Sequence, residues 1–357
     1  MTIRIALLSM KEIEKRGQGI PTYIEELYKN LKKLEKIEDI KVEKIYFPRI
    51  KFLGDALSFE LNSLFYPVKN SFDIFHIPTG FFIIHRLPPD AKIISTIHDI
   101  NPIRPKTKNL NYIIKDKLWR YIALKRGLVW NLRSSSELIA NSSQTKEEID
   151  DLGIKGLSIN IVNLGIDKRF FVKSKRSHNY ENKKFKVGYI GSFATNKNVD
   201  FILQTANILN DSVFCLWGAK SYDYEALVEK SKNLKNIEFM GFAPEKKIVR
   251  IYDSFDVFTF PSLYEGFGLP ILEAQSRGLP VIIYKYGKIP KEVRKYCFEA
   301  ENPEHMAQII KDLKDNGYNE KLRKKAMKYA RSFTWERCAR ETVKIYKFIA
   351  NSNVHIS

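Results

Sequence analysis

Short apolar runs alternate with segments of helical periodicity along most of the chain. In the first half, such runs predict strands at residues 3–9, 41–47, 72–77, 92–98, 137–141 and 158–163. The apolar positions of residues 20–34 recur with the 3.6-residue period of an amphipathic helix. Further helices are predicted at residues 109–132 and 144–152. Continuous apolar strands that alternate with helices are typical of a parallel sheet covered on both faces.

The same alternation restarts after a polar, aperiodic stretch at residues 173–185, which we interpret as a linker. Strands are predicted at 187–192, 213–218, 237–242, 256–261 and 280–284, and helices at 197–209, 222–232, 244–255 and 268–277, with three more after residue 302. The fold class is therefore α/β, with two doubly wound, Rossmann-like parallel sheets. We expect an N-terminal domain of residues 1–172 and a C-terminal domain of residues 186–335. The last helix, at about 336–357, is expected to pack back on the N-terminal domain, and a ligand cleft is expected between the domains.

Composition adds a charge imbalance to this picture. The 357 residues include 60 Lys and Arg against 41 Asp and Glu, a formal net charge of +19, which indicates an anionic partner. A hydrophobic content of 44% argues against a disordered chain. The three cysteines, Cys215, Cys297 and Cys338, lie far apart and match neither a disulfide framework nor a zinc site. No run approaches the roughly 18 apolar residues of a membrane span, so we expect a cytoplasmic protein.

The most informative segment is residues 261–274, which follow a predicted strand and lead into a helix. Gly266 and Gly268 let the backbone approach a ligand closely, and the free N–H groups of the following helix can bind phosphate. Glu265 stands at the strand end, and Glu273, inside the helix, can accept hydrogen bonds from both hydroxyls of a vicinal diol. This combination suits a nucleoside diphosphate joined to a sugar. The alternative is a tight structural turn with two solvated acids.

The segment from Glu265 to Glu273 resembles the E-x7-E signature of the retaining family 4 (group 1) glycosyltransferases, which have the GT-B fold. Residues 17–27 are similar to the glycine loop and first helix of that family, and residues 96–100 to its strand-end His-Asp. Four further family motifs have counterparts in the same order, so the resemblance covers nearly the whole chain. These counterparts are residues 162–167, 191–198, 277–281 and 290–293. The chain departs from the family at Ser192 and Asn196, where many relatives carry arginine, and 290–293 is one residue longer than usual.

The resemblance implies a metal-independent hexosyltransferase that moves a sugar from a UDP- or GDP-sugar to a glycan or lipid-linked acceptor with retention. No cofactor and no metal site is expected. It implies catalytic roles for Glu265, His98 and Lys197. The expected donor-binding residues are Gly19, Gly191, Ser192, Lys197, Glu265, Gly266, Phe267, Gly268, Leu269 and Glu273.

Three of these residues also have a structural interpretation. Lys197 follows a strand and can offset the charge that grows on a departing diphosphate, but it can equally be one surface lysine among many. His98 ends an apolar strand, where the alternative is a capping histidine; His76 and His85 are interpreted as structural. Gly19 permits close approach at the start of the first helix, although Gly17 is equally available.

A basic, aromatic stretch at residues 101–133 carries nine Lys and Arg against one acid, Asp116. Such a helix is typical of a membrane-surface element, and the alternative is a solvated face over a buried aromatic stripe. We therefore expect residues 109–133 to contact an anionic surface, which would make the protein peripheral at the inner membrane face. No nucleic-acid recognition motif accompanies the charge. Alternative functions are a nucleotide-sugar 2-epimerase of the same fold and, in a different class, a basic nucleic-acid- or membrane-binding protein without catalysis.

Overall fold

The computed structural model describes residues 2–10, 19–48, 60–63, 71–81, 83–85, 87–88, 90–100, 118–172, 184–221 and 223–352, and within 118–123 it describes the side chain of Ile122 alone. The chain divides into two compact units. Unit 1 consists of residues 1–165 with 335–357, and unit 2 of residues 166–334. The last helix, α13 (Trp335–Asn351), therefore belongs to unit 1 although it follows unit 2 in the sequence.

Unit 1 is built on a six-stranded sheet in the order β2-β1-β3-β4-β5-β6, with every neighbouring pair parallel. Its strands are β1 (Ile3–Ser9), β2 (Ile40–Tyr46), β3 (Ile74–Ile77), β4 (Lys92–Ile97), β5 (Glu137–Ala140) and β6 (Ile159–Ile161). All four residues of β3 and of β5 are buried, as expected for central strands covered on both faces.

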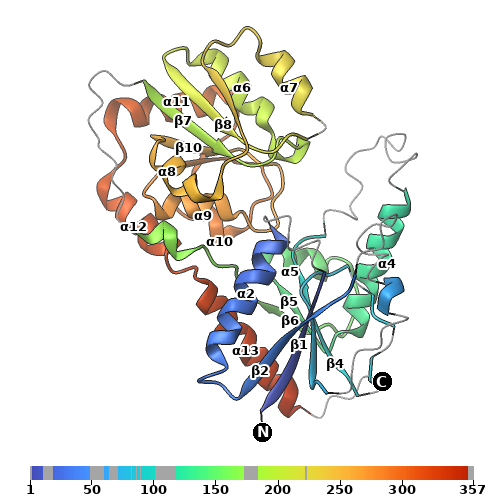
Figure 1. Cartoon of the computed structure of the whole chain (residues 1–357). Coiled ribbons are helices and arrows are strands. Elements are labelled where there is room, and N and C mark those ends of the chain that lie inside the picture. Colours follow the sequence, from blue (N-terminus) through green and yellow to red (C-terminus); the bar gives the residue numbers. More distant parts are fainter. Residues whose placement is uncertain are drawn as a thin grey trace. The chain divides into compact units, whose positions relative to one another are not determined.

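The helices of unit 1 cover both faces of that sheet. α2 (Ile20–Leu34) and α13 pack against each other on one face, and α4 (Leu118–Ser134) lies over the other (Figure 1). A short helix, α5 (Ser143–Asp150), begins at Ser142, whose hydroxyl accepts a hydrogen bond from the Thr145 N–H. The Lys92 ammonium donates to the carbonyls of Ile349 and Ala350 at 2.8 and 3.2 Å. These carbonyls lie at the carboxyl end of α13, where backbone acceptors have no partner within the helix.

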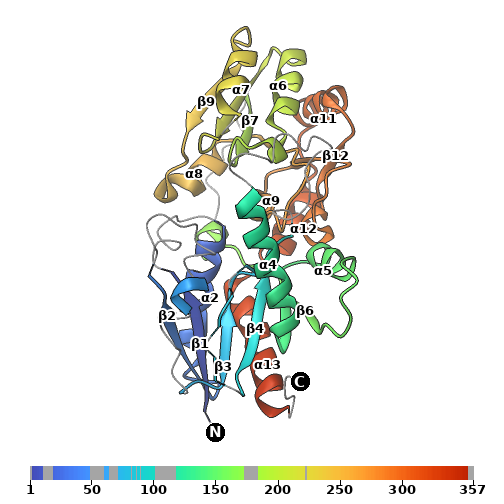
Figure 2. The ribbon, with the colours of Figure 1, turned by 90° about the vertical axis from the view of Figure 1, so that its right-hand side faces the viewer.

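Unit 2 repeats this plan with a second parallel sheet in the order β12-β11-β10-β7-β8-β9. Its strands are β7 (Phe185–Ile190), β8 (Ser212–Trp217), β9 (Ile237–Gly241), β10 (Val257–Phe260), β11 (Val281–Tyr284) and β12 (Phe298–Ala300). The helices are α6 (Val199–Ile208), α7 (Tyr224–Ser231), α8 (Ile248–Asp253), α9 (Leu269–Ser276), α10 (Lys291–Arg294), α11 (Pro303–Asn316) and α12 (Glu320–Ala330), with 3-10 turns η3 (Lys168–Phe171), η4 (Thr195–Lys197) and η5 (Glu245–Lys247). α6 packs with α11, and α9 packs with α12 (Figures 1 and 2).

In each sheet the strand order reverses beside the first strand of the unit, between β1 and β3 and between β7 and β10. Loops that leave a parallel sheet on either side of such a reversal separate, and ligands bind outside the carboxyl ends of the strands there. The predicted fold class, two doubly wound parallel sheets, is confirmed.

Several local predictions were wrong at the level of single turns. β12 and α10 were not predicted, and the helix predicted at 244–255 begins as the 3-10 turn η5 before α8. Lys197 was expected to open a helix but ends η4, because Asn198 takes a left-handed conformation with φ of 53° and separates it from α6. Residues 173–183 of the predicted linker and 109–117 of the predicted basic helix lie outside the described residues. Within the described ranges, no helix is both long and apolar enough to cross a bilayer.

Candidate functional site

The first turn of the site follows β7. A Cβ on Gly191 would lie 2.6 Å from the Tyr189 hydroxyl oxygen, so any larger residue there would have to displace the Tyr189 side chain. That hydroxyl donates a hydrogen bond to the Ser192 carbonyl at 2.7 Å, which fixes the chain directly after Gly191. The turn continues into η4, where Lys197 is the last residue.

The second turn follows β10, the sheet neighbour of β7. Gly268 is left-handed at the amino end of α9, with φ of 100°, a conformation that favours glycine. The Leu263 N–H donates to the Asn196 carbonyl at 2.8 Å, so the two turns are hydrogen-bonded to each other. Phe267 is buried and its ring lies 6.1 Å from that of Phe333, so its side chain belongs to the core of unit 2.

Lys197 and Glu265 meet where these two turns converge. The Lys197 ammonium lies 2.6 Å from Glu265 Oε1 and 5.3 Å from the centre of the Phe260 ring. Both side chains are largely enclosed, with exposed fractions of 18% and 9%. Burial raises the pKa of Tyr189, and the negative charge of Glu265 raises it further. Two sequence-predicted residues 68 positions apart therefore form one charged pair because β7 and β10 are adjacent.

Glu273 lies one turn into α9 and has a different environment. Its carboxyl accepts a hydrogen bond from the buried Tyr252 hydroxyl at 2.7 Å. Burial raises the pKa of Glu273 to about 7. The hydrogen bond from Tyr252 and the positive charge of Arg169 act in the opposite direction and lower it. An acid that titrates near neutral pH, with one edge still exposed, can change its hydrogen-bonding capacity when a ligand binds.

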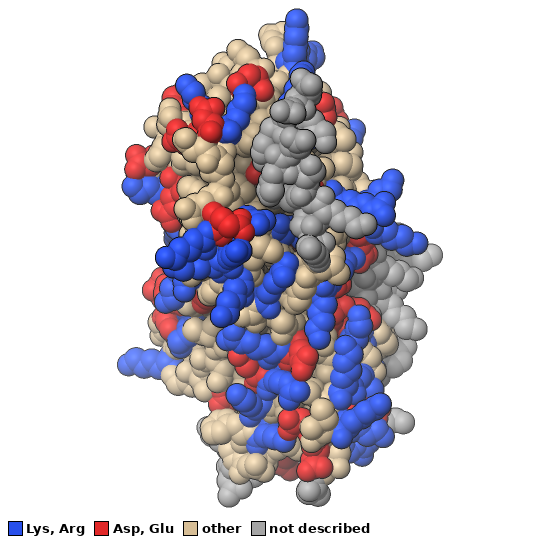
Figure 3. All heavy atoms as spheres, turned by 90° about the vertical axis from the view of Figure 1, so that its left-hand side faces the viewer, with Lys and Arg blue, Asp and Glu red and all other residues tan. Residues whose placement is uncertain are grey.

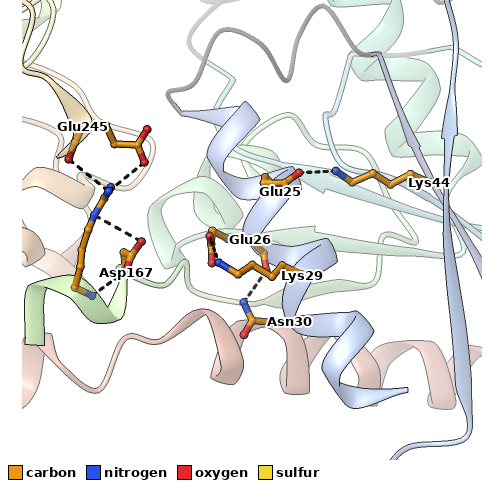
Figure 4. Close-up of polar contacts among 8 residues, drawn as sticks. Glu25, Glu26, Lys29, Asn30, Lys44, Asp167 and Glu245 are labelled. Carbon is orange, nitrogen blue, oxygen red and sulfur yellow. Dashed lines mark hydrogen bonds and ion pairs between the residues drawn. The ribbon is translucent and has the colours of Figure 1, made fainter. Parts of the chain in front are cut away.

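Asp167, Arg169 and Glu245 form a connected group of charged residues within unit 2. The Arg169 guanidinium donates to Glu245 Oε1 at 3.1 Å, and the Arg169 N–H donates to Asp167 Oδ1 at 2.8 Å; Figure 4 labels the two acids on either side of this contact. The Asp167 charge raises the pKa of Glu273, whereas the Arg169 charge lowers it. The pKa of Glu273 therefore depends on charged groups in the segment that precedes β7.

The remaining predicted residues, Gly19 and His98, lie in unit 1. Gly19 precedes α2 with φ of 69°, and a Cβ there would meet nothing within 4 Å, so its conformation rather than space favours glycine. His98 follows β4, is 8% exposed, and its Nε2 lies 3.0 Å from the Pro78 carbonyl. Burial lowers the pKa of His98 to about 4, although the hydrogen bond to Pro78 raises it. The imidazole is therefore neutral at physiological pH.

The structure thus places the predicted site residues in two groups. One group stands at the carboxyl ends of β7 and β10 and continues into α9; it consists of Gly191, Ser192, Lys197, Glu265, Gly266, Phe267, Gly268, Leu269 and Glu273. The other group is Gly19 and His98, joined through Tyr23, whose ring centre lies 4.6 Å from that of His98. Sequence reasoning missed Tyr23 and Tyr252. Tyr23 stands four residues after Gly19 on the inner face of α2, whereas nothing in the sequence around Tyr252 relates it to Glu273.

Charge outside the site is concentrated on several helices. α12 carries five Lys and Arg against one Glu, and Figure 3 shows a face of the molecule on which blue side chains outnumber red ones. Acidic neighbours on α2 neutralise part of the charge there, since Glu26 pairs with Lys29 and Glu25 with Lys44 (Figure 4). Among the described residues, no group of three or more His, Cys, Asp or Glu is arranged to hold a metal ion.

Comparison with known proteins identifies the family. The model described as Glycosyltransferase Family 4 matches residues 19–170, and the model described as Glycosyl transferases group 1 matches residues 171–333. The chain belongs to the group 1 (family 4) glycosyltransferases. The O-antigen chain mannosyltransferase B of Escherichia coli is 27% identical to this glycosyltransferase over 304 residues, which are 77% of this chain and 74% of that protein.

Solved structures support the fold of this glycosyltransferase independently. The sucrose-phosphate synthase of Thermosynechococcus elongatus superimposes with a TM-score of 0.75 at 17% identity, covering 97% of this chain and 98% of the other. Anabaena Alr3699/HepE, solved in complex with UDP and glucose, superimposes with a TM-score of 0.69 at 16% identity, covering 97% and 100%. The predicted family and the GT-B fold class are both confirmed.

Proposed function

We propose that this glycosyltransferase moves a hexose from a UDP- or GDP-sugar to a glycan or lipid-linked acceptor, with retention of configuration and without a catalytic metal. The observation that carries the proposal is the enclosed Lys197–Glu265 pair at the joined carboxyl ends of β7 and β10. This is the edge of the sheet where parallel α/β folds bind ligands, and it offers a cation and a carboxylate side by side.

In this proposal, the donor diphosphate lies against the turn of Gly191 and Ser192, next to Lys197. The cation offsets the negative charge that grows on the diphosphate as the sugar leaves, an effect that is often the largest single contribution to catalysis. Glu265 holds the sugar, and Glu273 accepts hydrogen bonds from the ribose hydroxyls. Gly266, Phe267, Gly268 and Leu269 supply backbone that can approach the donor closely.

In this proposal, His98 contacts the donor sugar or its diphosphate, and Gly19 is a further donor-binding residue. We assign no covalent nucleophile, so Glu265 is a donor ligand rather than an attacking group. The acceptor hydroxyl attacks on the face that the diphosphate leaves, and the departing diphosphate takes the acceptor proton. Two relatives support this substrate class, since one is a mannosyltransferase and the other was solved in complex with UDP and glucose.

A thermal-shift panel of UDP, GDP and their sugars tests the donor assignment. A ligand present at 100 times its Kd stabilises the folded state by about 2.7 kcal/mol, so one nucleoside diphosphate is expected to raise Tm clearly above the other. The donor so identified is then incubated with candidate acceptors in EDTA. Sugar transfer with release of the nucleoside diphosphate supports the proposal. No shift with any ligand contradicts the donor assignment, and activity that EDTA abolishes and Mn²⁺ restores contradicts the metal-free mechanism.

We also propose that residues 109–133 dock this protein on anionic lipid at the inner membrane face. Among the described residues of that segment, Lys125 and Arg126 are exposed, and Arg126 pairs with Glu60 at 3.0 Å. Each Lys or Arg near an anionic surface contributes about 1 kcal/mol, which salt screens. Replacing Lys117, Arg120, Lys125 and Arg126 with Gln is expected to release the protein from anionic vesicles at low salt. Equal flotation of the variant and the wild type would contradict this.

A further inference from the structure

A chain of four buried polar side chains runs through the core of unit 1 and ends against His98. The Tyr346 hydroxyl of α13 lies 2.6 Å from His76 Nδ1, and His76 Nε2 lies 2.8 Å from the Thr96 hydroxyl. Thr96 lies in turn 2.9 Å from the Tyr23 hydroxyl. All four side chains are at most 1% exposed, so these contacts are shielded from water.

The series of hydrogen bonds passes through a neutral imidazole. Burial lowers the pKa of His76 to about 3, so its imidazole is neutral and must donate at one nitrogen and accept at the other. The tautomer of His76 therefore affects the hydrogen bonds that the Tyr346 and Thr96 hydroxyls make on either side of it. Hydrogen bonds in such a series polarise one another, so the whole series holds the Tyr23 hydroxyl more firmly than an isolated bond.

Tyr23 connects this series of hydrogen bonds to His98. Its ring packs edge-on against the imidazole, with ring centres 4.6 Å apart and an interplanar angle of 77°. On the other side of His98, the Pro78 carbonyl can only accept a hydrogen bond, so His98 Nε2 carries the proton and Nδ1 does not. The ring is therefore held both by a hydrogen bond and by an aromatic contact, and it presents an unprotonated nitrogen.

We propose that Tyr23 is a positioning residue for His98 and that Tyr346, through His76 and Thr96, anchors Tyr23 from the C-terminal helix α13. This inference rests on the proposed function, in which His98 contacts the donor. It assigns a role in the reaction to His76, which sequence analysis interpreted as structural, and to α13, which returns to unit 1 after the chain has completed unit 2.

A purely structural role predicts a different pattern of effects. If the polar chain serves only to fill the core, removing a hydroxyl lowers stability and affects every activity of the protein alike. If it positions His98, removing a hydroxyl lowers turnover only while His98 is present. The two interpretations therefore separate in a double-mutant cycle.

The experiment measures kcat and donor KM for Tyr23→Phe, Tyr23→Leu, Tyr346→Phe and His98→Ala, and for Tyr23→Leu combined with His98→Ala. Tyr23→Phe and Tyr346→Phe are expected to lower kcat roughly three- to tenfold with little change in donor KM, as one lost buried hydrogen bond would. Tyr23→Leu also removes the ring contact and is expected to cost more. In the His98→Ala background, Tyr23→Leu is expected to cause no further loss, and an equal loss in both backgrounds overturns the proposal.

The matched control is Thr342→Val, which removes another fully buried hydroxyl from α13. That hydroxyl donates to the Cys338 carbonyl of the same helix at 2.9 Å and takes no part in the chain to His98. Thr342→Val is expected to leave kcat unchanged. A loss equal to that of Tyr346→Phe would mean that α13 acts through general stability, which overturns the role of Tyr346.

Nitrogen NMR of the full chain labelled at histidine provides a second measurement, which stays informative if no donor is turned over and the proposed function fails. His98 is expected to show a protonated Nε2 and an unprotonated Nδ1 in the wild type. Tyr23→Phe, the variant more certain to fold, is expected to shift or broaden these signals, and Thr342→Val is not. Identical His98 signals in the wild type and in Tyr23→Phe overturn the proposal independently of any activity.

Discussion

The two groups of site residues both follow strands of a parallel sheet, but one group is charged and the other is neutral. In unit 2, Lys197 and Glu265 are both charged and lie 2.6 Å apart in a largely enclosed position. In unit 1, His98, Tyr23, Thr96 and His76 are uncharged and are joined by hydrogen bonds and ring contacts. Both groups stand just beyond the carboxyl ends of parallel strands, so the backbone fold alone does not decide which chemistry a site carries.

The difference shows how burial selects protonation states. Desolvation lowers the pKa of His76 and His98 and raises that of Glu273, so in all three cases it favours the neutral form. Lys197 and Glu265 instead form an ion pair in which each charge compensates the other. A site for a departing diphosphate requires fixed charge, whereas a site for sugar hydroxyls requires oriented neutral donors and acceptors. On the proposed function, Lys197 supplies this fixed charge.

Breaking the charged pair is expected to have the largest effect. Glu265→Ala should lower kcat by roughly 100- to 1,000-fold, comparable to removing a preorganised group that stabilises the transition state. Lys197→Ala should lower both turnover and affinity for the nucleoside diphosphate. Steady-state kinetics with the identified donor check both variants, and near-normal values would show that the pair is only structural.

A double variant separates stability from catalysis within this pair. Removing one partner of an enclosed pair leaves an uncompensated charge, whereas replacing both can be nearly neutral. We therefore expect Lys197→Met combined with Glu265→Gln to have a higher Tm than Lys197→Met alone and to remain inactive. Recovery of turnover together with Tm would contradict the assignment of the pair to the reaction.

Glu273 tests whether a near-neutral acid in unit 2 serves the donor. Glu273→Ala should weaken nucleoside-diphosphate binding by about 1.5–3 kcal/mol, as expected for hydrogen bonds to a charged group. Only the ionised carboxylate accepts from both ribose hydroxyls, so wild-type affinity should rise as pH increases through about 7. Calorimetry between pH 6 and 8 measures this slope. Glu301→Gln, an exposed acid that pairs with Lys285, should retain it, and a flat wild-type profile would contradict the role of Glu273.

The neutral histidines of unit 1 predict that the stability of the folded protein also rises with pH. His76 and His98 have folded pKa values of about 3 and 4, whereas an unfolded histidine titrates near 6.5. Between pH 6.5 and 4 the unfolded chain binds protons that the folded chain does not, so stability falls as pH falls. At pH 5 each histidine should cost about 2 kcal/mol relative to pH 7.

Urea unfolding of the wild type and of His76→Gln at pH 7 and pH 5 measures this contribution. The difference between the two pH values should be about 2 kcal/mol smaller in His76→Gln, because one titrating group is gone. The exposed His305 provides the control, and His305→Gln should keep the wild-type dependence. The same pH dependence in all three proteins would mean that His76 binds protons equally in the folded and unfolded states.

Sequence predicted most of the scaffold because buried parallel strands are continuous apolar runs. The strand predicted at 3–9 coincides with β1, and the one predicted at 137–141 differs from β5 by one residue. β12 was missed because Phe298, Glu299 and Ala300 are too few to form a periodic signal. Asn198 was missed as a helix boundary, although asparagine is one of the few residues besides glycine that adopt the left-handed conformation readily.

The site was predicted as a set of residues but not as a set of contacts. The identities of Lys197 and Glu265 came from local context and resemblance, whereas their pairing depends on β10 lying beside β7, which local patterns do not specify. Tyr252 reaches Glu273 from α8 for the same reason. The motif residues can therefore be read from the chain, while the groups that tune them depend on strand order.

Tyr252 provides the smallest and most specific test of the comparison. Its hydroxyl donates to Glu273, and this hydrogen bond lowers the pKa of that carboxyl. In Tyr252→Phe the pKa of Glu273 should rise, so a larger fraction is protonated at pH 7 and nucleoside-diphosphate affinity should fall by about 1 kcal/mol. At pH 8.5 most of the carboxyl ionises in either protein, so the difference should shrink. Tyr318→Phe is the matched control, because the buried Tyr318 hydroxyl makes no hydrogen bond within the described structure. A loss of affinity in Tyr252→Phe that is independent of pH would mean that Tyr252 orients Glu273 without tuning its ionisation.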